Sequence, residues 1–174
     1  MSILKVIKER RSVRRYKTEP IPEDVIHRVL EAARFSPSGK NLQPWKFILV
    51  QDESLKHRLV EACIKQKFIA EAPVIVVACG FPDRCYSRMG NYMKSWAVDV
   101  AVAVEHLVLQ AQEEGLGTCW IGAFEEKDVK SILNVPDGVK VLALTPLGYP
   151  AENPAFRGRK SLEEIVCYNF YQNQ

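Results

Sequence analysis

The segment Met93–Glu114, MKSWAVDVAVAVEHLVLQAQEE, contains the longest apolar run of the chain, and it decides the fold. Its length and its Ala, Val and Leu content predict one long helix. Apolar residues occupy nearly every face of that helix, so one domain of this size can hardly cover it, and we expect a subunit partner to cover the rest. Asp99, Glu105 and His106 interrupt the run, which disfavours a helix that spans a membrane.

Shorter elements lie on both sides of this helix. Before it we expect helices that begin at Ile3 and Ile21, and after it a glycine-rich helix end at Gly115–Gly117. The other predicted elements are a strand at Lys46–Val50, a helix at Glu53–Gln66, a strand at Pro73–Cys79, a strand at Thr118–Ile121, a helix at Glu125–Leu133 and a strand at Val139–Leu147. This order predicts an α+β or α/β sheet layered with helices.

Composition favours one compact domain, residues 1–174. The chain is 47% hydrophobic and 26% charged, which suits a single globular core. The first residues are basic without a signal-like apolar stretch, so we expect a cytoplasmic protein with no membrane partner. The five cysteines are odd in number and irregular in spacing, which predicts buried free thiols and no metal site.

Two arginine clusters stand out against a formal net charge of only +3. The first, Arg10-Arg11-Ser12-Val13-Arg14-Arg15-Tyr16, has four guanidinium groups, whose forked donors match phosphate oxygens. In the second, Arg157 and Arg159 are two apart in an extended segment, so they point the same way and can grip one phosphate. The alternatives are a solvated basic helix end for the first cluster and a charged surface loop for the second.

The segment Ser36-Pro37-Ser38-Gly39-Lys40-Asn41-Leu42-Gln43-Pro44-Trp45 is a second candidate site. Its small residues let backbone approach a ligand, and its amides offer donors and acceptors that suit a flat heterocycle with imide edges. A plain connecting turn is the alternative. Pro44 and Trp45 would be a costly surface choice for such a linker, which favours a site.

The chain resembles the flavin-dependent nitroreductase family in three segments. They are the first arginine cluster, the segment Ser36–Trp45, and Gly115-Leu116-Gly117-Thr118-Cys119-Trp120-Ile121-Gly122. With the Ala72–Val76 strand and the tail from Arg157 to Tyr168, the resemblance covers essentially the whole chain in the expected order. It implies an α+β fold in which helices flank a mixed β-sheet, with the long central helix at a homodimer interface and a swapped C-terminal tail.

The resemblance also implies where FMN binds. Arg10, Arg11, Ser12 and Arg14 would hold the phosphate and ribityl chain, with Arg14 also near the ring edge, and Arg157 and Arg159 would close the phosphate site. Loop residues of the other subunit would reach the isoalloxazine ring: Pro37, Ser38, Gly39, Asn41 and Gln43. The segment Cys119, Trp120, Ile121, Gly122 and Ala123 would lie against the flavin, with the N–H of Gly122 or Ala123 at N5.

Some positions carry less signal. Family members often place Asn or Gln before the Ala-Pro strand to contact the flavin; the stretch here is Lys65-Gln66-Lys67, and Lys65 is carried over. Cys119, Asp99 and His106 show no assembled triad, so core or interface roles are expected and no catalytic side chain is named. The short segment Gly80–Met93 predicts a compact lid over an open cleft.

The implied activity is an oxidoreductase that runs a ping-pong cycle. NADH or NADPH would reduce the flavin and leave, and a small electron-poor acceptor such as a nitroaromatic or a quinone would then enter. One alternative is a specialised flavin enzyme of the same fold, of a dehalogenase or flavin-fragmenting type. Another is a flavin-binding protein without turnover, whereas a nucleic-acid binder is disfavoured because no reading helix or aromatic platform accompanies the arginines.

Overall fold

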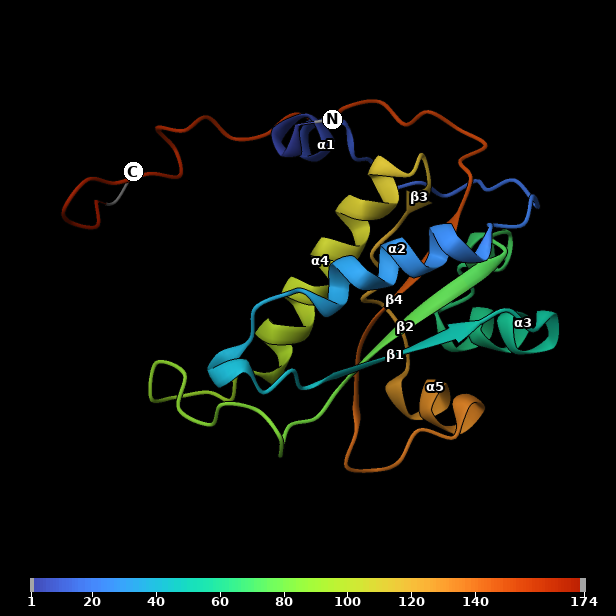
Figure 1. Cartoon of the computed structure of the whole chain (residues 1–174), viewed down its shortest axis with the longest axis horizontal. Coiled ribbons are helices and arrows are strands. Elements are labelled where there is room, and N and C mark those ends of the chain that lie inside the picture. Colours follow the sequence, from blue (N-terminus) through green and yellow to red (C-terminus); the bar gives the residue numbers. More distant parts are fainter. Residues whose placement is uncertain (1, 173–174) are drawn as a thin grey trace.

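The computed structural model describes residues 2–172, in which helices cover both faces of a central sheet (Figure 1). The elements in chain order are α1 (Ile3–Glu9), α2 (Glu23–Arg34), the 3-10 helix η1 (Gly39–Asn41), β1 (Trp45–Val50), α3 (Glu53–Ala62), the 3-10 helix η2 (Lys67–Ala70), β2 (Val74–Gly80), α4 (Trp96–Glu113), β3 (Gly117–Thr118), α5 (Glu126–Leu133) and β4 (Lys140–Gly148).

The sheet confirms the predicted α+β class. Its strand order is β1-β2-β4-β3, and each neighbouring pair is antiparallel. The resemblance implied a sheet with both parallel and antiparallel pairing. Within residues 2–172 the only parallel pairing is one isolated bridge between Ser12 and Thr118. That bridge matters for the site, because it joins the first arginine cluster to β3.

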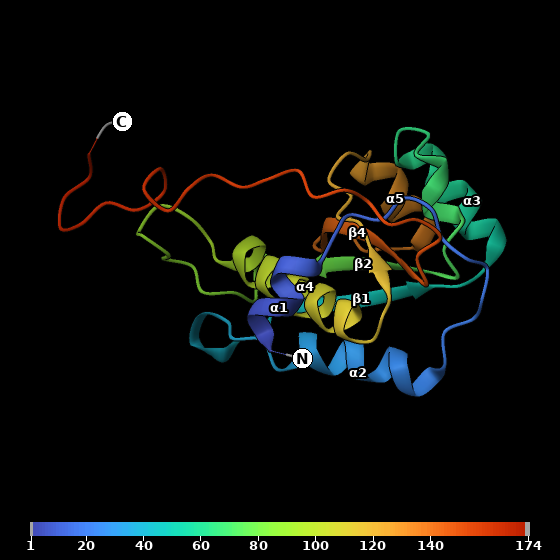
Figure 2. The ribbon, with the colours of Figure 1, turned by 90° about the horizontal axis from the view of Figure 1, so that it is seen from above.

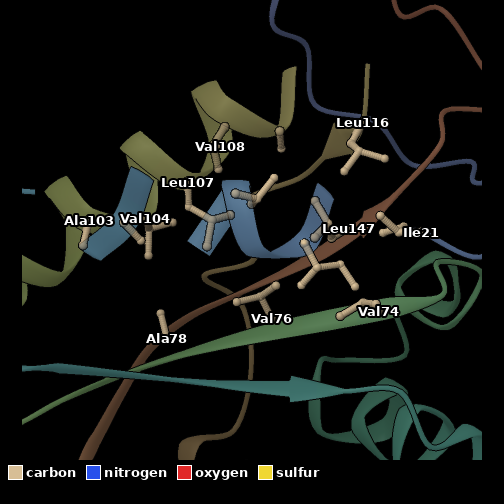
Figure 3. Packing of buried hydrophobic residues seen from close by; sticks show 14 of the residues in the cluster. Ile21, Val74, Val76, Ala78, Ala103, Val104, Leu107, Val108, Leu116 and Leu147 are labelled. Atoms are coloured by element: carbon tan, nitrogen blue, oxygen red, sulfur yellow. The ribbon is translucent and has the colours of Figure 1, made fainter. Parts of the chain in front are cut away.

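Alternation along β2 divides the core into two layers. Val74, Val76 and Ala78 pack with α2 and α4 (Figure 3), whereas the residues between them pack with α3 and α5 on the other face. Figure 2 shows the two helix layers on opposite sides of the strands. Because both faces are covered, every residue of β2 is buried, which explains its continuous run of Val, Ile and Ala.

Helix α4 is buried on one side only. Val100, Ala103 and Leu107 have no exposed surface, but Ala101, Val102 and Leu109 are half-buried and Val98 is 36% exposed. The chain by itself therefore leaves part of this apolar helix uncovered, as the sequence predicts.

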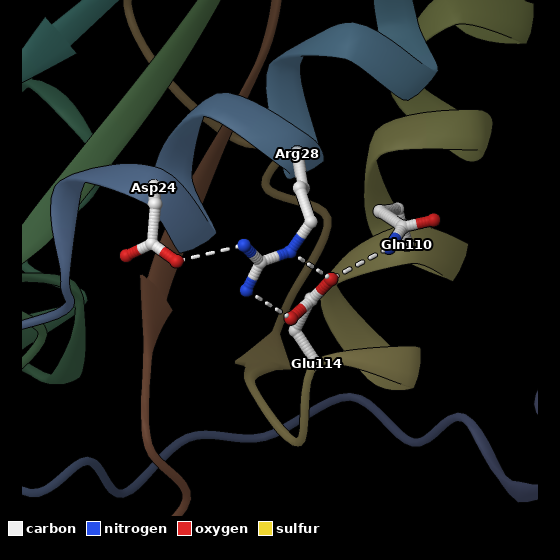
Figure 4. A network of polar contacts seen from close by, with 4 residues as sticks. All are labelled: Asp24, Arg28, Gln110 and Glu114. Atoms are coloured by element: carbon white, nitrogen blue, oxygen red, sulfur yellow. Dashed lines mark hydrogen bonds and ion pairs between the residues drawn. The ribbon is translucent and has the colours of Figure 1, made fainter.

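A polar network fastens the C-terminal end of α4 to α2 (Figure 4). The Arg28 guanidinium donates to both carboxylate oxygens of Glu114, at 2.8 and 2.9 Å, and to Asp24 Oδ2 at 2.8 Å. Gln110 Nε2 donates to Glu114 Oε1 at 2.8 Å. The hydrogen bonds from Arg28 hold the pKa of Glu114 below its ordinary value. This fork ties the end of α4 to α2.

Several element boundaries differ from the prediction. The helix expected at Glu53–Gln66 ends at Ala62, because Lys65 N donates to Val60 O and closes a left-handed C-terminal turn. The strand expected at Thr118–Ile121 is only Gly117–Thr118, with Ile121 paired to Leu144 in an isolated bridge. Helix α4 begins at Trp96 rather than Met93, since the chain before it forms a bridge between Met89 and Met93.

The cysteine prediction is wrong for two of the five residues. Cys63, Cys79 and Cys119 are buried free thiols, but Cys85 is only half-buried and Cys167 is exposed. Burial raises the pKa of Cys63 and of Cys79 to about 11, so these two thiols stay protonated at neutral pH.

Ile64 offers a test of the left-handed turn after α3. A branched side chain at φ 55° is strained, and Ile64 is 61% exposed, so little burial compensates. Ile64→Asn should therefore raise the free energy of unfolding by about 1 kcal/mol, measured by urea denaturation. Ile64→Val keeps the branch and should give no gain; an equal gain from both substitutions would contradict the strain argument.

Candidate functional site

The two arginine clusters, 147 residues apart in sequence at Arg10 and Arg157, meet in one pocket. The pocket has a volume of about 460 Å³ and is open on one side. It is lined by Arg10, Arg11, Ser12, Arg14, Glu152, Pro154, Ala155, Phe156, Arg157 and Arg159. All the residues predicted to hold a phosphate therefore lie around one cavity.

Backbone pairing with β3 positions the first cluster. Val13 N donates to Thr118 O at 2.9 Å, next to the parallel bridge between Ser12 and Thr118. Val13 is buried against Gly117, where an added Cβ would lie 2.9 Å from the Val13 side chain. Only glycine allows this approach, which turns the side chains of Ser12 and Arg14 toward the pocket and keeps the cluster beside Cys119–Ala123.

Contacts among the pocket residues orient the guanidinium groups. Arg11 Nη1 donates to Lys8 O at 2.6 Å and to Arg10 O at 2.9 Å, so its position is set by backbone. The ring of Phe156 lies 4.9 Å from the Arg11 guanidinium and 5.4 Å from that of Arg159. This aromatic ring links the two clusters through cation–π contacts.

Arg14 and Arg15 point to different places. Arg14 lines the pocket, and its backbone N–H donates to the Glu152 carboxylate. Arg15 lies outside the pocket lining, where its Nε is 3.5 Å from Glu71 Oε2 and its side chain is 69% exposed. Neighbours in an extended segment project to opposite sides, which separates their roles.

The segment Cys119–Ala123 runs from the buried core to the surface. Cys119 N donates to Thr145 Oγ1 at 3.2 Å, and Ile121 N donates to Leu144 O at 2.8 Å. Trp120 is 43% exposed, and Gly122 and Ala123 are exposed as well. Burial raises the pKa of the Cys119 thiol, which disfavours a nucleophilic thiolate and agrees with the expected core role.

The side chain of Gln66 contacts the segment Cys119–Ala123. The sequence instead predicted Lys65 as the flavin-binding residue of this stretch. Gln66 Nε2 donates to Ala123 O at 3.0 Å and to Cys63 O at 2.8 Å. Lys65 is exposed at φ 57°, and a flavin contact by Lys65 stays a prediction. Within the stretch Lys65-Gln66-Lys67 the structure turns the Gln66 side chain toward Ala123, which the sequence did not predict.

Figure 1 shows the loop Ser38–Gln43 at one end of α4 and β3 at the other end. Gly39 N donates to Asp99 Oδ1, in the first turn of α4, at 3.0 Å, whereas the pocket adjoins β3, beyond the last turn. With 18 residues, α4 is about 27 Å long. Within one chain, Pro37, Ser38, Gly39, Asn41 and Gln43 therefore lie apart from the arginines.

The backbone of this loop is strained at three non-glycine positions. Lys40, Asn41 and Gln43 have φ angles of 54°, 55° and 49°, in the left-handed region that non-glycine residues rarely adopt. Ser38 Oγ accepts a hydrogen bond from Gln43 N at 2.9 Å and closes the loop on itself. Strain of this kind concentrates at ligand-binding sites, which favours the site interpretation over a plain turn.

The chain after β4 leaves the body of the structure (Figures 1 and 2). Residues 155–172 are exposed throughout, including the apolar Leu162 (70%), Ile165 (63%) and Tyr168 (82%). A turn at residues 163–165 ends at Ile165, and residues 166–168 form no strand within one chain, so strand addition to a neighbour stays a prediction.

Glu152 and Phe156 are pocket residues that sequence reasoning missed. Phe156 directly precedes Arg157 and stands three positions before Arg159, but this placement alone did not predict that its ring contacts Arg11. Glu152 likewise carried no signal for the pocket. Within residues 2–172, no cluster of His, Cys, Asp or Glu is suited to hold a metal, and no helix has the length and hydropathy needed to cross a membrane.

Comparison with known proteins identifies the family. The model of the nitroreductase family matches residues 7–73 and 62–149. An NADH dehydrogenase of Thermus thermophilus is 33% identical over 189 residues, covering 92% of this chain and 92% of that protein. An iodotyrosine deiodinase of Thermotoga neapolitana is 30% identical over 190 residues, covering 94% of this chain and 96% of that protein.

A solved structure agrees with these matches. The crystal structure of a nitroreductase family protein from Clostridium novyi superposes with a TM-score of 0.80 at 34% identity, covering 87% of each chain. The family model, the similar proteins and the solved structure agree, and the chain belongs to the nitroreductase family.

Proposed function

We propose that this chain is an NAD(P)H-dependent flavin oxidoreductase that holds FMN with its phosphate in the arginine pocket. The observation that carries the proposal is the convergence of Arg10, Arg11, Arg14, Arg157 and Arg159 on one cavity. Such a pocket suits a phosphate dianion, because guanidinium forks bind two oxygens at once.

The donors present fit FMN rather than FAD. The single carboxylate among the lining residues, Glu152, accepts a hydrogen bond from Arg14 N, which limits its repulsion toward a phosphate. A dinucleotide would call for a glycine-rich turn of the GxGxxG type, and the chain has none. Ser12 and Arg14 would hold the phosphate and ribityl chain, and Cys119–Ala123 would lie along the ring.

The flavin ring calls for a second copy of the chain. In one chain, most of the length of α4 separates the loop Ser38–Gln43 from the pocket. A homodimer that pairs the half-covered face of α4 would bring the loop of one copy to the pocket of the other. The exposed apolar tail supports the same assembly, because its side chains gain burial only on a partner.

When bound, FMN would supply hydride acceptance from the nicotinamide and hydride donation to an electron-poor acceptor. The chain's own part is to bind and orient. The arginines would anchor one end of the cofactor, and the N–H of Gly122 or Ala123, both exposed residues, would meet the reactive edge. Donor and acceptor would use the same open cleft in turn, so we expect ping-pong kinetics with nitroaromatics or quinones.

We expect the purified protein to be yellow and to release FMN. Mass spectrometry of the released cofactor identifies it, and anaerobic NADH or NADPH should bleach its visible absorbance. FAD, or a colourless protein that does not take up added FMN, would overturn the proposal. Bound FMN that neither nicotinamide bleaches would instead indicate a flavin-binding protein without turnover.

A dehalogenase-type flavin enzyme is the second candidate. The relative from Thermotoga neapolitana, named an iodotyrosine deiodinase, matches over nearly its whole length. The lid segment Gly80–Met93 is short here and shows no added element that would enclose an amino-acid substrate. Iodide release from iodotyrosine by the reduced protein, at a rate above that of nitroaromatic reduction, would favour this candidate.

A cytoplasmic location and a lack of nucleic-acid partners stay predictions from composition.

A further inference from the structure

Asp99 is a buried carboxylate that the proposed chemistry does not use. It lies in the first turn of α4 and is 5% exposed. Its two oxygens accept hydrogen bonds from different parts of the chain: Oδ1 from Gly39 N at 3.0 Å, and Oδ2 from Ser95 Oγ at 2.6 Å. A buried charge is costly unless its oxygens are satisfied, so both bonds are needed in the folded protein.

The bond to Gly39 fastens a strained loop. Three non-glycine residues in Ser38–Gln43 have positive φ, and such backbone persists only when the surroundings hold it. The bond from Gln43 N to Ser38 Oγ is internal to the loop, so it fixes the loop's shape but not its place. The bond to Asp99 ties that shape to the rigid helix α4.

The bond to Ser95 extends the same anchor to the lid. Ser95 Oγ accepts a hydrogen bond from Tyr86 N at 3.1 Å, and Ser95 N donates to Tyr86 O at 2.9 Å. The lid then packs on the loop: Lys40 Nζ lies 5.3 Å from the centre of the Tyr86 ring, and a Cβ on Gly39 would lie 2.7 Å from Tyr86 Cβ. Loop and lid thus share one anchor.

We propose that Asp99 is a positioning residue for the flavin ring: it holds the loop Ser38–Gln43 in its strained, ring-receiving shape and, through Ser95, sets the lid against it. The inference rests on the proposed function, since the loop is taken to meet the isoalloxazine of the other copy. Asp99 thus supports binding at the ring end of the cofactor, and the arginines support binding at the phosphate end.

Riboflavin separates the two ends of the cofactor, because it has the ring and ribityl chain of FMN but no phosphate. Asp99→Ala should weaken riboflavin and FMN by the same factor, about fivefold, the affinity that one net hydrogen bond supplies. Asp99→Asn still accepts from Gly39 N and should keep both affinities within about twofold. Ser95→Ala leaves Oδ2 without its donor and should weaken both flavins equally, by a smaller factor than Asp99→Ala.

The measurement is flavin fluorescence quenching on titration into the apo-dimer, with thermal unfolding recorded in parallel. Arg28→Ala is the matched control: it cuts the fork at the other end of α4, and it should lower the unfolding temperature without changing either flavin affinity.

Unchanged riboflavin affinity in Asp99→Ala would overturn the inference, as would a loss by Asp99→Asn as large as that by Asp99→Ala. If Asp99→Ala does not fold, Ser95→Ala decides, and unchanged affinity there overturns the inference too. A wild-type protein that binds neither flavin would refute the proposed function itself. Failure of the proposed function can therefore be distinguished from failure of the inference about Asp99.

Discussion

Replacing Arg14 by Ala should weaken FMN binding about tenfold or more, whereas replacing Arg15 by Ala should change it little. Arg14 lines the pocket, and its guanidinium would make a charge-assisted, bidentate contact with the phosphate. Such contacts are worth about 1.5 to 3 kcal/mol. Arg15 faces Glu71 with a side chain that is 69% exposed, so solvent and salt screen its charge.

The contrast between these neighbours is measured by titrating FMN into both apo-variants at matched salt. Riboflavin provides the control for Arg14→Ala, because it lacks the phosphate and should therefore lose affinity by a smaller factor than FMN does. Equal losses of FMN affinity from Arg14→Ala and Arg15→Ala would mean that the cluster acts only as a diffuse positive field. A loss of riboflavin affinity as large as that of FMN would mean that Arg14 does not contact the phosphate.

The arginine pocket shows what the sequence could predict about the site. Guanidinium chemistry marked both arginine clusters as candidate anion sites, and the resemblance to the nitroreductase family implied that they share one site; the structure brings them to one cavity. The stack of Phe156 on Arg11 and Arg159 was not predictable in the same way. It depends on how the chain turns after β4, which no local pattern encodes.

The fold, like the site, was predictable from the sequence only in part. Period and composition predicted the helices and strands around Met93–Glu114, because burial on both faces of β2 demands continuous apolar residues. The end of α3 was missed, because Ile64 adopts a left-handed conformation that its side chain disfavours, and tertiary contacts override that preference. Asp99 was placed in the core correctly, but its anchoring role needs Gly39 and Ser95, which meet it from different segments.

Removing the residues after Glu163 should cost dimer stability and FMN retention together. The deleted segment includes Ile165, Tyr168 and Tyr171, which are 63%, 82% and 87% exposed in a single chain. Burying such a side chain on a partner contributes about 1.5 to 3 kcal/mol, so loss of several should shift the dimer toward monomer. A tail seated on the neighbour also draws Arg157 and Arg159 into place, which links assembly to cofactor binding.

Light scattering and the flavin absorbance of the purified variant test this expectation. A triple substitution of Ile165, Val166 and Tyr168 by Ser keeps the chain length and should reproduce the deletion, because it removes the apolar contacts alone. Lys160→Ser, in the same exposed segment, is the polar control and should leave both properties unchanged. A truncated protein that stays dimeric and yellow would show that the tail is a frayed terminus, and the exchange of tails between copies would be wrong.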